Sequence, residues 1–289
     1  MSKIIHSSAE DSRIRRAMVG NKLSFSASEA YKLLRTNVMF SLPVEEYNRV
    51  FGITSSVQGE GQSTTAIKLA YSLAEANKRV LLIEMDMRLP VMHKSLPISK
   101  APGLSNLLVG SAMLADSLQK SGIHENLYVL TAGDLPPNPS ELLGSERMKT
   151  LLDTFRERFD YILCDLPPIT VVSDALMISP LLSGVIVVVR KNYADRQAVT
   201  EAVRQLEFSK VKILGFVMTY GEAGGSGSKK YGKRYYKYGY KYGYDRGYGS
   251  ARPDYSYAGA QARSRAQQEE EKNRAKKQTP AETQQPAPR

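Results

Sequence analysis

The fold follows from one stretch of the chain, Val50-Phe51-Gly52-Ile53-Thr54-Ser55-Ser56-Val57-Gln58-Gly59-Glu60-Gly61-Gln62-Ser63-Thr64. An apolar run suited to a buried strand passes through a loop with two glycines into a segment with helical spacing. Such a loop can point its backbone N–H groups at an anion, and the helix that follows adds the partial positive charge of its N-terminus. The stretch therefore predicts a phosphate-binding loop at the carboxyl end of a first strand.

Strand-like and helix-like segments alternate on both sides of this loop. Apolar runs of Val, Ile and Leu predict strands at 50–55, 79–86, 127–131, 161–165, 184–190 and 212–219. Helical spacing and charge predict helices at 63–77, 145–158 and 195–209. Near-continuous apolar strands separated by helices indicate an α/β fold with a doubly wound, mostly parallel sheet of the P-loop NTPase type.

Composition divides the chain into three regions. Residues 1–22 are polar and lack periodicity, which predicts a flexible N-terminal arm. Residues 23–220 carry the strand and helix pattern and form the predicted α/β domain that contains the phosphate loop. Residues 221–289 begin with the linker-like Gly221-Glu222-Ala223-Gly224-Gly225-Ser226-Gly227-Ser228, continue with a tyrosine-rich segment and end in a polar stretch, so we predict a disordered tail.

The formal charge of +11 is concentrated in the predicted tail. Eight cations and one anion lie between residues 229 and 252. This distribution favours an anionic partner for the tail and argues against a domain that binds nucleic acid over a whole basic face.

Cysteine content and hydropathy exclude several further classes of protein. The single cysteine, Cys164, excludes a disulfide framework and a cysteine-cluster zinc site. The N-terminus has no apolar core of signal-peptide length, and the run Val185–Val189 is too short to cross a bilayer. We expect a soluble, cytoplasmic protein.

One position of the phosphate loop departs from the common pattern. The hydroxyl of Ser63 is placed to bind Mg²⁺, but position 62 is Gln where a P-loop has the Lys that reaches the β and γ phosphates. On this loop alone, a turn that merely joins a strand to a helix is an equal reading.

Carboxylates end two of the predicted strands. Glu84 and Asp86 follow one apolar run, and Asp165 follows another. Ligands bind at the carboxyl ends of strands in open α/β sheets, and a strand-ending Asp is the expected Mg²⁺-orienting group. Each carboxylate alone would more often be a solvated strand end or a helix cap. Together with the loop, they predict a nucleotide site that uses Mg²⁺.

These motifs give the chain a family likeness. It resembles the bacterial tyrosine kinases of capsule and exopolysaccharide synthesis, in particular their separate cytoplasmic subunit. The resemblance covers about residues 24–245 and rests on the segments 28–37, 59–64, 86–90, 132–143 and 160–168, and on the tyrosine cluster.

The resemblance implies residue roles. ATP and Mg²⁺ would bind at the phosphate loop, whose positions are Ser56, Gly59, Glu60, Gly61, Gln62, Ser63 and Thr64. Mg²⁺ would be held by Ser63, Asp86 and Asp165, and the carboxylate of Glu84 or Asp86 would take the acceptor's proton. The helix with Glu29, Lys32 and Arg35 would form the subunit contact of a homo-oligomer, often a ring.

The resemblance also implies an acceptor and partners. Phosphate would pass to the tail of a neighbouring subunit, on Tyr231, Tyr235, Tyr236, Tyr238, Tyr240, Tyr242, Tyr244 and Tyr248. Each phosphate would add about −1.5 to −2 charges to a basic segment. A membrane-bound polysaccharide chain-length regulator would activate the kinase at the inner face of the membrane, and a phosphotyrosine phosphatase would reverse the reaction. No nucleic-acid partner is expected.

Three positions depart from the family pattern: Gln62 replaces Lys, Glu84 replaces Asp, and Lys32 replaces Arg. Because Gln brings no positive charge to the triphosphate, one hypothesis is a weak or inactive kinase. The opposing hypothesis is that a nearby cation such as Arg88 replaces the lysine.

Three other readings compete with this one. A pseudokinase would bind nucleotide and be phosphorylated by another kinase. A partitioning ATPase would carry an extra Lys where this chain has Val57, which argues against that reading. An RNA-binding protein would use the basic, aromatic tail.

Overall fold

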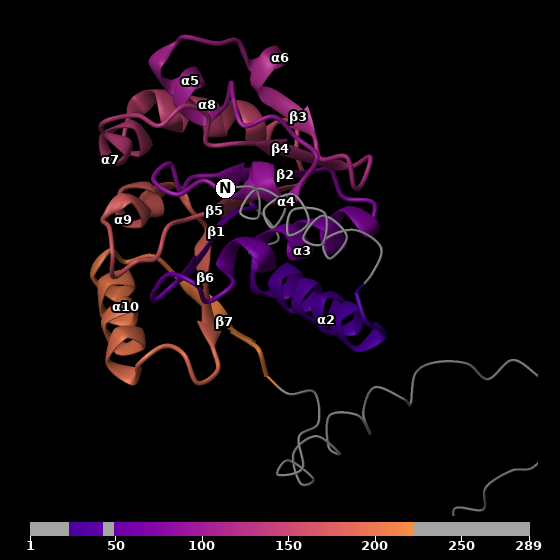
Figure 1. The fold of residues 1–289 in the computed structure, drawn as a ribbon, viewed down its shortest axis with the longest axis vertical. Coiled ribbons are helices and arrows are strands. Elements are labelled where there is room, and N and C mark those ends of the chain that lie inside the picture. The colour runs from indigo at the N-terminus through magenta and orange to yellow at the C-terminus, as the bar shows by residue number, and fades with distance from the viewer. Residues whose placement is uncertain (1–22, 43–48, 222–289) are drawn as a thin grey trace, which may run out of the picture. The chain divides into compact units, whose positions relative to one another are not determined.

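A computed structural model describes residues 23–42 and 49–221 (Figure 1). The predicted arm and the tyrosine cluster of the tail lie outside these residues. The strands are β1 Val50–Ser55, β2 Val80–Glu84, β3 Leu118–Lys120, β4 Leu127–Leu130, β5 Tyr161–Asp165, β6 Gly184–Arg190 and β7 Ile213–Thr219. The longer helices are α2 Phe25–Ser41, α3 Gln62–Glu75, α8 Glu146–Arg156 and α10 Arg196–Phe208, and the shorter ones are α4 Met92–Ser95, α5 Leu104–Val109, α6 Leu114–Ser117, α7 Pro139–Leu143, α9 Asp174–Ile178 and the 3₁₀ helix η1 Ser179–Leu181.

The strands form a single sheet in the order β3-β4-β2-β5-β1-β6-β7. All neighbouring pairs are parallel except β3 with β4. β2, β5 and β1 are parallel neighbours, so their carboxyl ends meet at one edge, and chain order reverses around β1. Ligands bind at that edge in sheets of this kind. The predicted fold class, a doubly wound and mostly parallel sheet, is confirmed.

Helices cover both faces of the sheet. Alternate residues of each strand enter different cores, as Phe51 and Ile53 pack with α2, α3 and α4 while Val50 packs with α5, α8 and α10. Figure 1 shows α2 and α3 on one side of the sheet and α10 on the other. Burial on both faces explains the near-continuous apolar runs in the strands. Cys164 lies fully buried in the second of these cores.

Strand positions follow the sequence pattern closely. β1, β5 and β6 have the predicted bounds, β2 is shorter than predicted by three terminal residues, and β4 and β7 are each shorter by one. β3 and the helices α4, α5, α6, α7 and α9 were not predicted. Among the residues that the structure describes, no helix is long and apolar enough to span a membrane.

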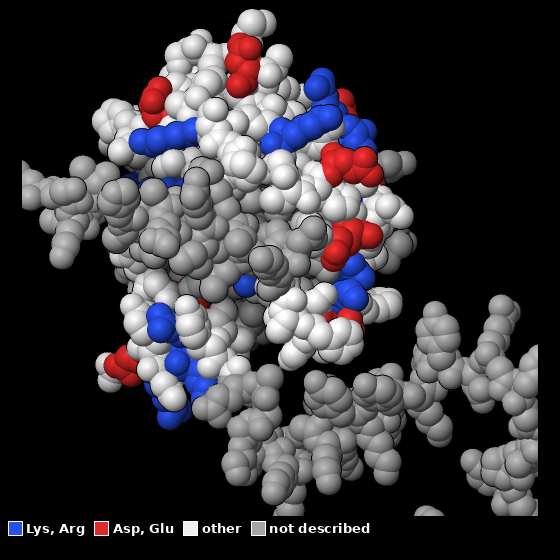
Figure 2. Space-filling model, turned by 45° about the vertical axis from the view of Figure 1, so that its right-hand side comes forward, with Lys and Arg blue, Asp and Glu red and all other residues white. Residues whose placement is uncertain are grey.

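Charged side chains are mixed over much of the visible surface. Figure 2 shows Lys and Arg interspersed with Asp and Glu over the upper and right-hand parts of the described domain. Neither sign of charge dominates this face of the domain.

Candidate active site

Two glycines give the phosphate loop its shape. Gly59 has φ +86° and Gly61 has φ +89°, in the left-handed region that side chains rarely adopt. A Cβ on Gly59 would also lie 2.8 Å from the hydroxyl of Tyr193. Gly61 is the N-cap of α3 and offers no side-chain hydrogen bond to the helix. The first N–H groups of a helix of 14 residues are therefore free of a side-chain cap and can face an anion.

The Glu60 carboxylate turns into the protein. Its Oε2 accepts hydrogen bonds from the Ser56 hydroxyl at 2.7 Å and the Val57 N–H at 2.8 Å. Its Oε1 accepts one from the Arg190 N–H at 3.0 Å, and the whole residue is buried. The backbone carbonyl of Glu60 accepts a further bond from the Thr219 hydroxyl. Glu60 thus joins the loop to the ends of β6 and β7. Because its side chain points into the protein, it does not occupy the outer side of the loop.

Gln62 is held within the protein by both ends of its amide. Nε2 donates to the Leu166 carbonyl at 2.6 Å, and Oε1 accepts a short hydrogen bond from the Ser55 hydroxyl. The side chain is 9% exposed. The amide therefore ties the end of β1 to the segment after β5, and in this conformation both of its polar atoms are engaged within the protein.

Asp165 ends β5 with an unsatisfied carboxylate. The residue is fully buried, and neither carboxylate oxygen has a hydrogen-bond partner. Burial raises the pKa of Asp165 well above its usual range, the nearby Ser63 hydroxyl opposes that rise, and the charges of Glu84 and Asp86 add to it. A buried carboxylate without a partner is costly for the fold, so this group is the one that most needs a ligand.

Asp86 lies partly exposed in the turn after β2. Its Oδ1 accepts hydrogen bonds from the N–H groups of Leu89 at 3.0 Å and Arg88 at 3.2 Å. Burial raises the pKa of Asp86, and these two N–H groups partly offset the rise. The other carboxylate oxygen makes no hydrogen bond to the residues that the structure describes, so it can meet a ligand.

Glu84 has a different environment, although it precedes Asp86 by two residues. Its Oε1 accepts hydrogen bonds from the N–H groups of Val91 at 2.5 Å and Met92 at 2.7 Å, and its Oε2 accepts one from Ala132 at 3.1 Å. The side chain is 1% exposed. Burial raises the pKa of Glu84, and the three N–H groups oppose that rise. Both of its oxygens thus accept hydrogen bonds from the backbone, at the start of α4 and just after β4.

These side chains fit a Mg²⁺ ion that is only partly held by protein. Over residues 23–42 and 49–221, no group of three or more His, Cys, Asp and Glu side chains is arranged to hold a metal ion by itself. Mg²⁺ is commonly bound through one or two carboxylates, with waters and substrate phosphates as the other ligands. The unpartnered oxygens of Asp165, beside Ser63 and Asp86, suit that arrangement.

Arg88 is joined to a buried aspartate that the sequence pattern did not single out. Its Nε and Nη2 donate to the two oxygens of Asp174 at 2.8 and 3.0 Å, and the Ser140 hydroxyl donates to Asp174 at 2.5 Å. Burial of Asp174 acts to raise its pKa, but the bonds from Arg88 and Ser140 outweigh it and the pKa is lowered. Asp174 opens α9 after the largely apolar segment 166–173, and no run or spacing distinguishes it in the sequence. The pair fixes the turn that contains Asp86 to α9, so Arg88 is engaged in this conformation and does not face the phosphate loop as a free cation.

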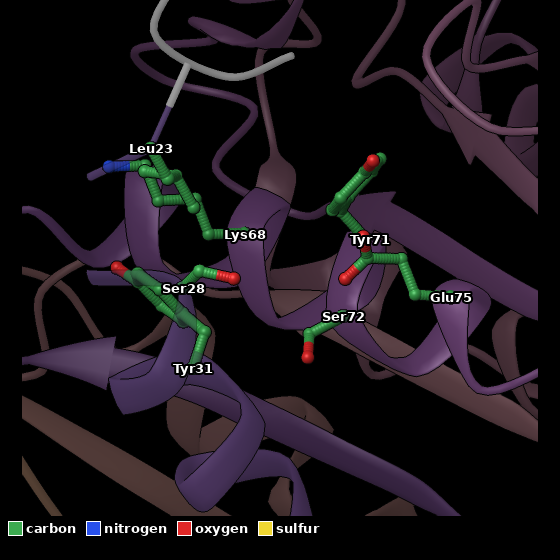
Figure 3. Close-up of a pocket in the computed structure, with 7 residues that line it drawn as sticks. All are labelled: Leu23, Ser28, Tyr31, Lys68, Tyr71, Ser72 and Glu75. Carbon is green, nitrogen blue, oxygen red and sulfur yellow. The ribbon is translucent and has the colours of Figure 1, made fainter. Parts of the chain in front are cut away.

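The helix α2 packs against α3 through one of the three residues predicted to form a subunit contact. Arg35 donates to the Ser72 carbonyl at 2.6 Å within the same chain, whereas Glu29 and Lys32 form an exposed ion pair of 2.8 Å. Figure 3 shows a small pocket between the two helices, with Tyr31 and Lys68 among its side chains. The packing of α2 leaves Phe25, Leu33 and Phe40 exposed.

The fold and the loop together define a P-loop NTPase of the α/β class. A family model described as an AAA domain matches residues 48–212. Tyrosine-protein kinase YwqD of Bacillus subtilis is 36% identical over 191 residues, which cover 66% of this chain and 80% of that protein. Tyrosine-protein kinase CpsD of Streptococcus agalactiae is 35% identical over 228 residues, which cover 76% and 95%.

A solved structure gives the same result. The kinase domain of the Escherichia coli tyrosine kinase ETK superposes with a TM-score of 0.63 at 31% identity and covers 70% of this chain and 80% of that one. The chain belongs to the bacterial tyrosine kinase family, as the sequence motifs predicted.

Proposed function

We propose that the chain is an ATP-dependent protein-tyrosine autokinase that regulates capsular or extracellular polysaccharide synthesis and export. The observation that carries this proposal is the buried, unpartnered carboxylate of Asp165 at the foot of the phosphate loop, next to Ser63 and Asp86. A site with this donor set suits Mg²⁺ and a triphosphate, and family membership supports tyrosine as the acceptor.

In this proposal the loop binds the phosphates, and the side chains next to it hold Mg²⁺. The N–H groups from Gly59 to Thr64 bind the phosphates, and Ser63, Asp165 and Asp86 hold Mg²⁺, directly or through water. Bound Mg²⁺ would neutralise charge on the phosphates during transfer. A tyrosine oxygen forms a bond to the γ-phosphorus while the bond from that phosphorus to the bridging oxygen of ADP breaks.

The geometry favours Asp86 over Glu84 as the group that takes the phenol proton. Glu84 accepts three backbone hydrogen bonds and is 1% exposed, so a tyrosine acceptor has no access to its carboxylate. Asp86 is partly exposed and has an oxygen free. Its raised pKa makes it a better base at neutral pH than an ordinary aspartate.

A second candidate function rests on Gln62. Because its amide is engaged with Ser55 and Leu166, the position supplies no charge to the γ-phosphate. A pseudokinase that binds nucleotide, assembles and is phosphorylated by another kinase is the alternative. The loss of one preorganised donor costs about 10²–10³ in rate. The autokinase and the pseudokinase therefore differ in phosphoryl transfer, whereas both bind nucleotide.

The acceptor and the partners are part of the same proposal. Phosphate passes in trans to the tail tyrosines between residues 231 and 248, in a homo-oligomer whose contact includes α2. A membrane-bound chain-length regulator holds this cytoplasmic chain at the membrane and activates it, and a phosphotyrosine phosphatase resets it. The exposed apolar side chains of α2 support a protein contact there.

The deciding experiment compares the full chain with its Gln62→Lys variant. Both are incubated with Mg²⁺-ATP, with and without the cytoplasmic segment of a chain-length regulator from the same organism, and phosphotyrosine is mapped by mass spectrometry. We expect Gln62→Lys to raise tail phosphorylation by about 10²–10³. Phosphate in the variant alone would favour the pseudokinase, and no phosphate in either would overturn the kinase assignment.

A further inference from the structure

The guanidinium of Arg190 lies between two tyrosine rings at the rim of the phosphate loop. Arg190 is the last residue of β6, and its guanidinium carbon is 4.5 Å from the centre of the Tyr193 ring and 4.1 Å from that of Tyr220. Both rings are about half exposed or more, at 52% and 69%. Cation–π contacts at exposed sites contribute about 0.5–1 kcal/mol each, so the stack is an arrangement that a stronger partner for the arginine could replace.

The same arginine holds the phosphate loop. Its Nη1 donates to the Gly59 carbonyl at 3.2 Å, and its backbone N–H donates to Glu60. The Tyr193 hydroxyl lies against the α-carbon side of Gly59. A movement of the Arg190 side chain would therefore break or change its hydrogen bond to the Gly59 carbonyl.

Tyr220 connects this stack to the start of the tail. It follows the last residue of β7 and directly precedes the glycine-rich linker. Its φ of +54° is in the left-handed region, which is unfavourable for a residue other than glycine and turns the backbone back at this point. The ring is packed on Arg190 while the residue as a whole stays 69% exposed. The hydroxyl of an exposed ring at the edge of a linker is accessible to an active site on another subunit.

We propose that Tyr220 is a phosphoacceptor and that Arg190 is the residue that binds its phosphate. This inference rests on the proposed kinase function, because the phosphoryl donor is Mg²⁺-ATP bound at the site of a neighbouring copy. The Tyr220 oxygen bonds to the γ-phosphorus, ADP leaves with the bridging oxygen, and the phenol proton passes to the base of that site. This transfer to Tyr220 is separate from the phosphorylation of the tail tyrosines between residues 231 and 248.

Phosphate on Tyr220 would change the loop through charge. A phosphotyrosine carries about −1.5 to −2 charges at pH 7 and forms charge-assisted hydrogen bonds to arginine. These are stronger than the cation–π contact and the single bond to the Gly59 carbonyl, so the guanidinium moves to the phosphate and releases Gly59. The added negative charge near the loop also repels nucleotide phosphates. Phosphorylation of Tyr220 thus lowers nucleotide affinity and limits the activity of the subunit that carries it.

Trypsin makes the modification easy to detect. Cleavage after Lys212 and Lys229 releases residues 213–229, in which Tyr220 is the only tyrosine, and residues 192–196 report Tyr193 separately. The full chain and its Gln62→Lys variant are incubated with Mg²⁺-ATP, and phosphate is located by fragment ions. We expect phosphate on Tyr220, and none on this peptide in Tyr220→Phe, which keeps the ring. Phosphate on the tail with none on Tyr220 overturns this inference and leaves the proposed function intact. No phosphotyrosine in either protein overturns both.

A second measurement tests the effect of the phosphate on the loop. Phosphotyrosine is incorporated during translation at position 220 or, as the matched control, at position 248, and Mg²⁺-ADP affinity is measured by calorimetry. We expect affinity about tenfold weaker with phosphate at 220 than at 248. Arg190→Gln should reduce that difference. Equal affinities for the two phosphorylated proteins would overturn the regulatory role of Tyr220.

Discussion

Glu84 and Asp165 end neighbouring strands and are paired in the β2–β5 register, yet their carboxylates have opposite surroundings. Both are buried, and burial raises the pKa of both. Glu84 accepts three backbone hydrogen bonds, whereas Asp165 has none. The difference shows that an acidic residue at a strand end can be part of the scaffold or part of the site, and that unsatisfied hydrogen-bonding capacity distinguishes the two.

The largest expected effect is the loss of kinase activity in the Asp165→Asn variant. If Asp165 is the carboxylate that needs a cation, its removal should lower tail phosphorylation by about 10³ and abolish the effect of Mg²⁺ on nucleotide affinity. Stability should not fall, because the change removes a buried charge without a partner. Phosphotyrosine mapping, calorimetry with and without Mg²⁺, and urea unfolding check the three parts. Unchanged Mg²⁺ dependence would show that Asp165 is scaffold like Glu84.

Glu84→Ala should mainly lower stability, whereas Asp165→Asn should mainly lower function. Three backbone N–H groups would lose their acceptor in a buried place, so we expect the free energy of unfolding to fall by about 3 kcal/mol. Glu84→Gln keeps an oxygen for two of them and should cost less. Urea unfolding of the two variants measures the difference. A fully stable Glu84→Ala protein that fails to transfer phosphate would reverse the roles assigned to Glu84 and Asp86.

Asp174 offers a third case, in which another side chain satisfies the carboxylate. Arg88→Met would leave Asp174 buried beside only Ser140, and we expect a loss of about 2 kcal/mol, reduced from the value for a fully buried pair because the Arg88 side chain is 44% exposed. Arg88→Met combined with Asp174→Asn should recover most of that loss. Unfolding in urea gives both values, and an Arg88→Met variant as stable as the parent would mean that the pair contributes little.

The smallest effect is a dependence of stability on pH. A raised pKa means that folded Asp165 holds its proton more tightly than the unfolded chain does, so its stabilising contribution is present below the usual value of 3.8 and is lost as pH rises through the raised pKa. Asp165→Asn should therefore be more stable than the parent at pH 7 by on the order of 1 kcal/mol, and equal to it at pH below 3.8. Unfolding curves for both proteins across this range check the sign, and a constant difference would contradict it.

Hydrophobic periodicity was enough to predict the sheet but not the short elements around it. The bounds of β1, β5 and β6 follow from apolar runs that end at turn residues. β3 has three residues, Leu118–Lys120, and no apolar run, because a short edge strand without a fully buried residue needs none. The helices α4 to α7 have four to six residues each, too few for a helical period to appear.

The site was predictable by residue type but not by role. The loop pattern pointed to Ser63 and Gly61, and the strand ends pointed to Asp86 and Asp165. The sequence could not show that the Glu60 side chain turns inward, because that depends on the Arg190 N–H, which lies 130 residues away in the chain. For the same reason it could not separate Glu84 from Asp165, since the amides that satisfy Glu84 come from later loops.

The buried position of Cys164 has a practical consequence for spectroscopy. The chain has no tryptophan and no other cysteine, and burial raises the pKa of this thiol, so it should not react with alkylating reagents while the core is closed. A cysteine introduced on the surface would then be the single reactive thiol, and one fluorophore or spin label could be attached without removing a native residue. In the unlabelled chain, the slow modification of Cys164 itself would measure how often the centre of the sheet opens to water.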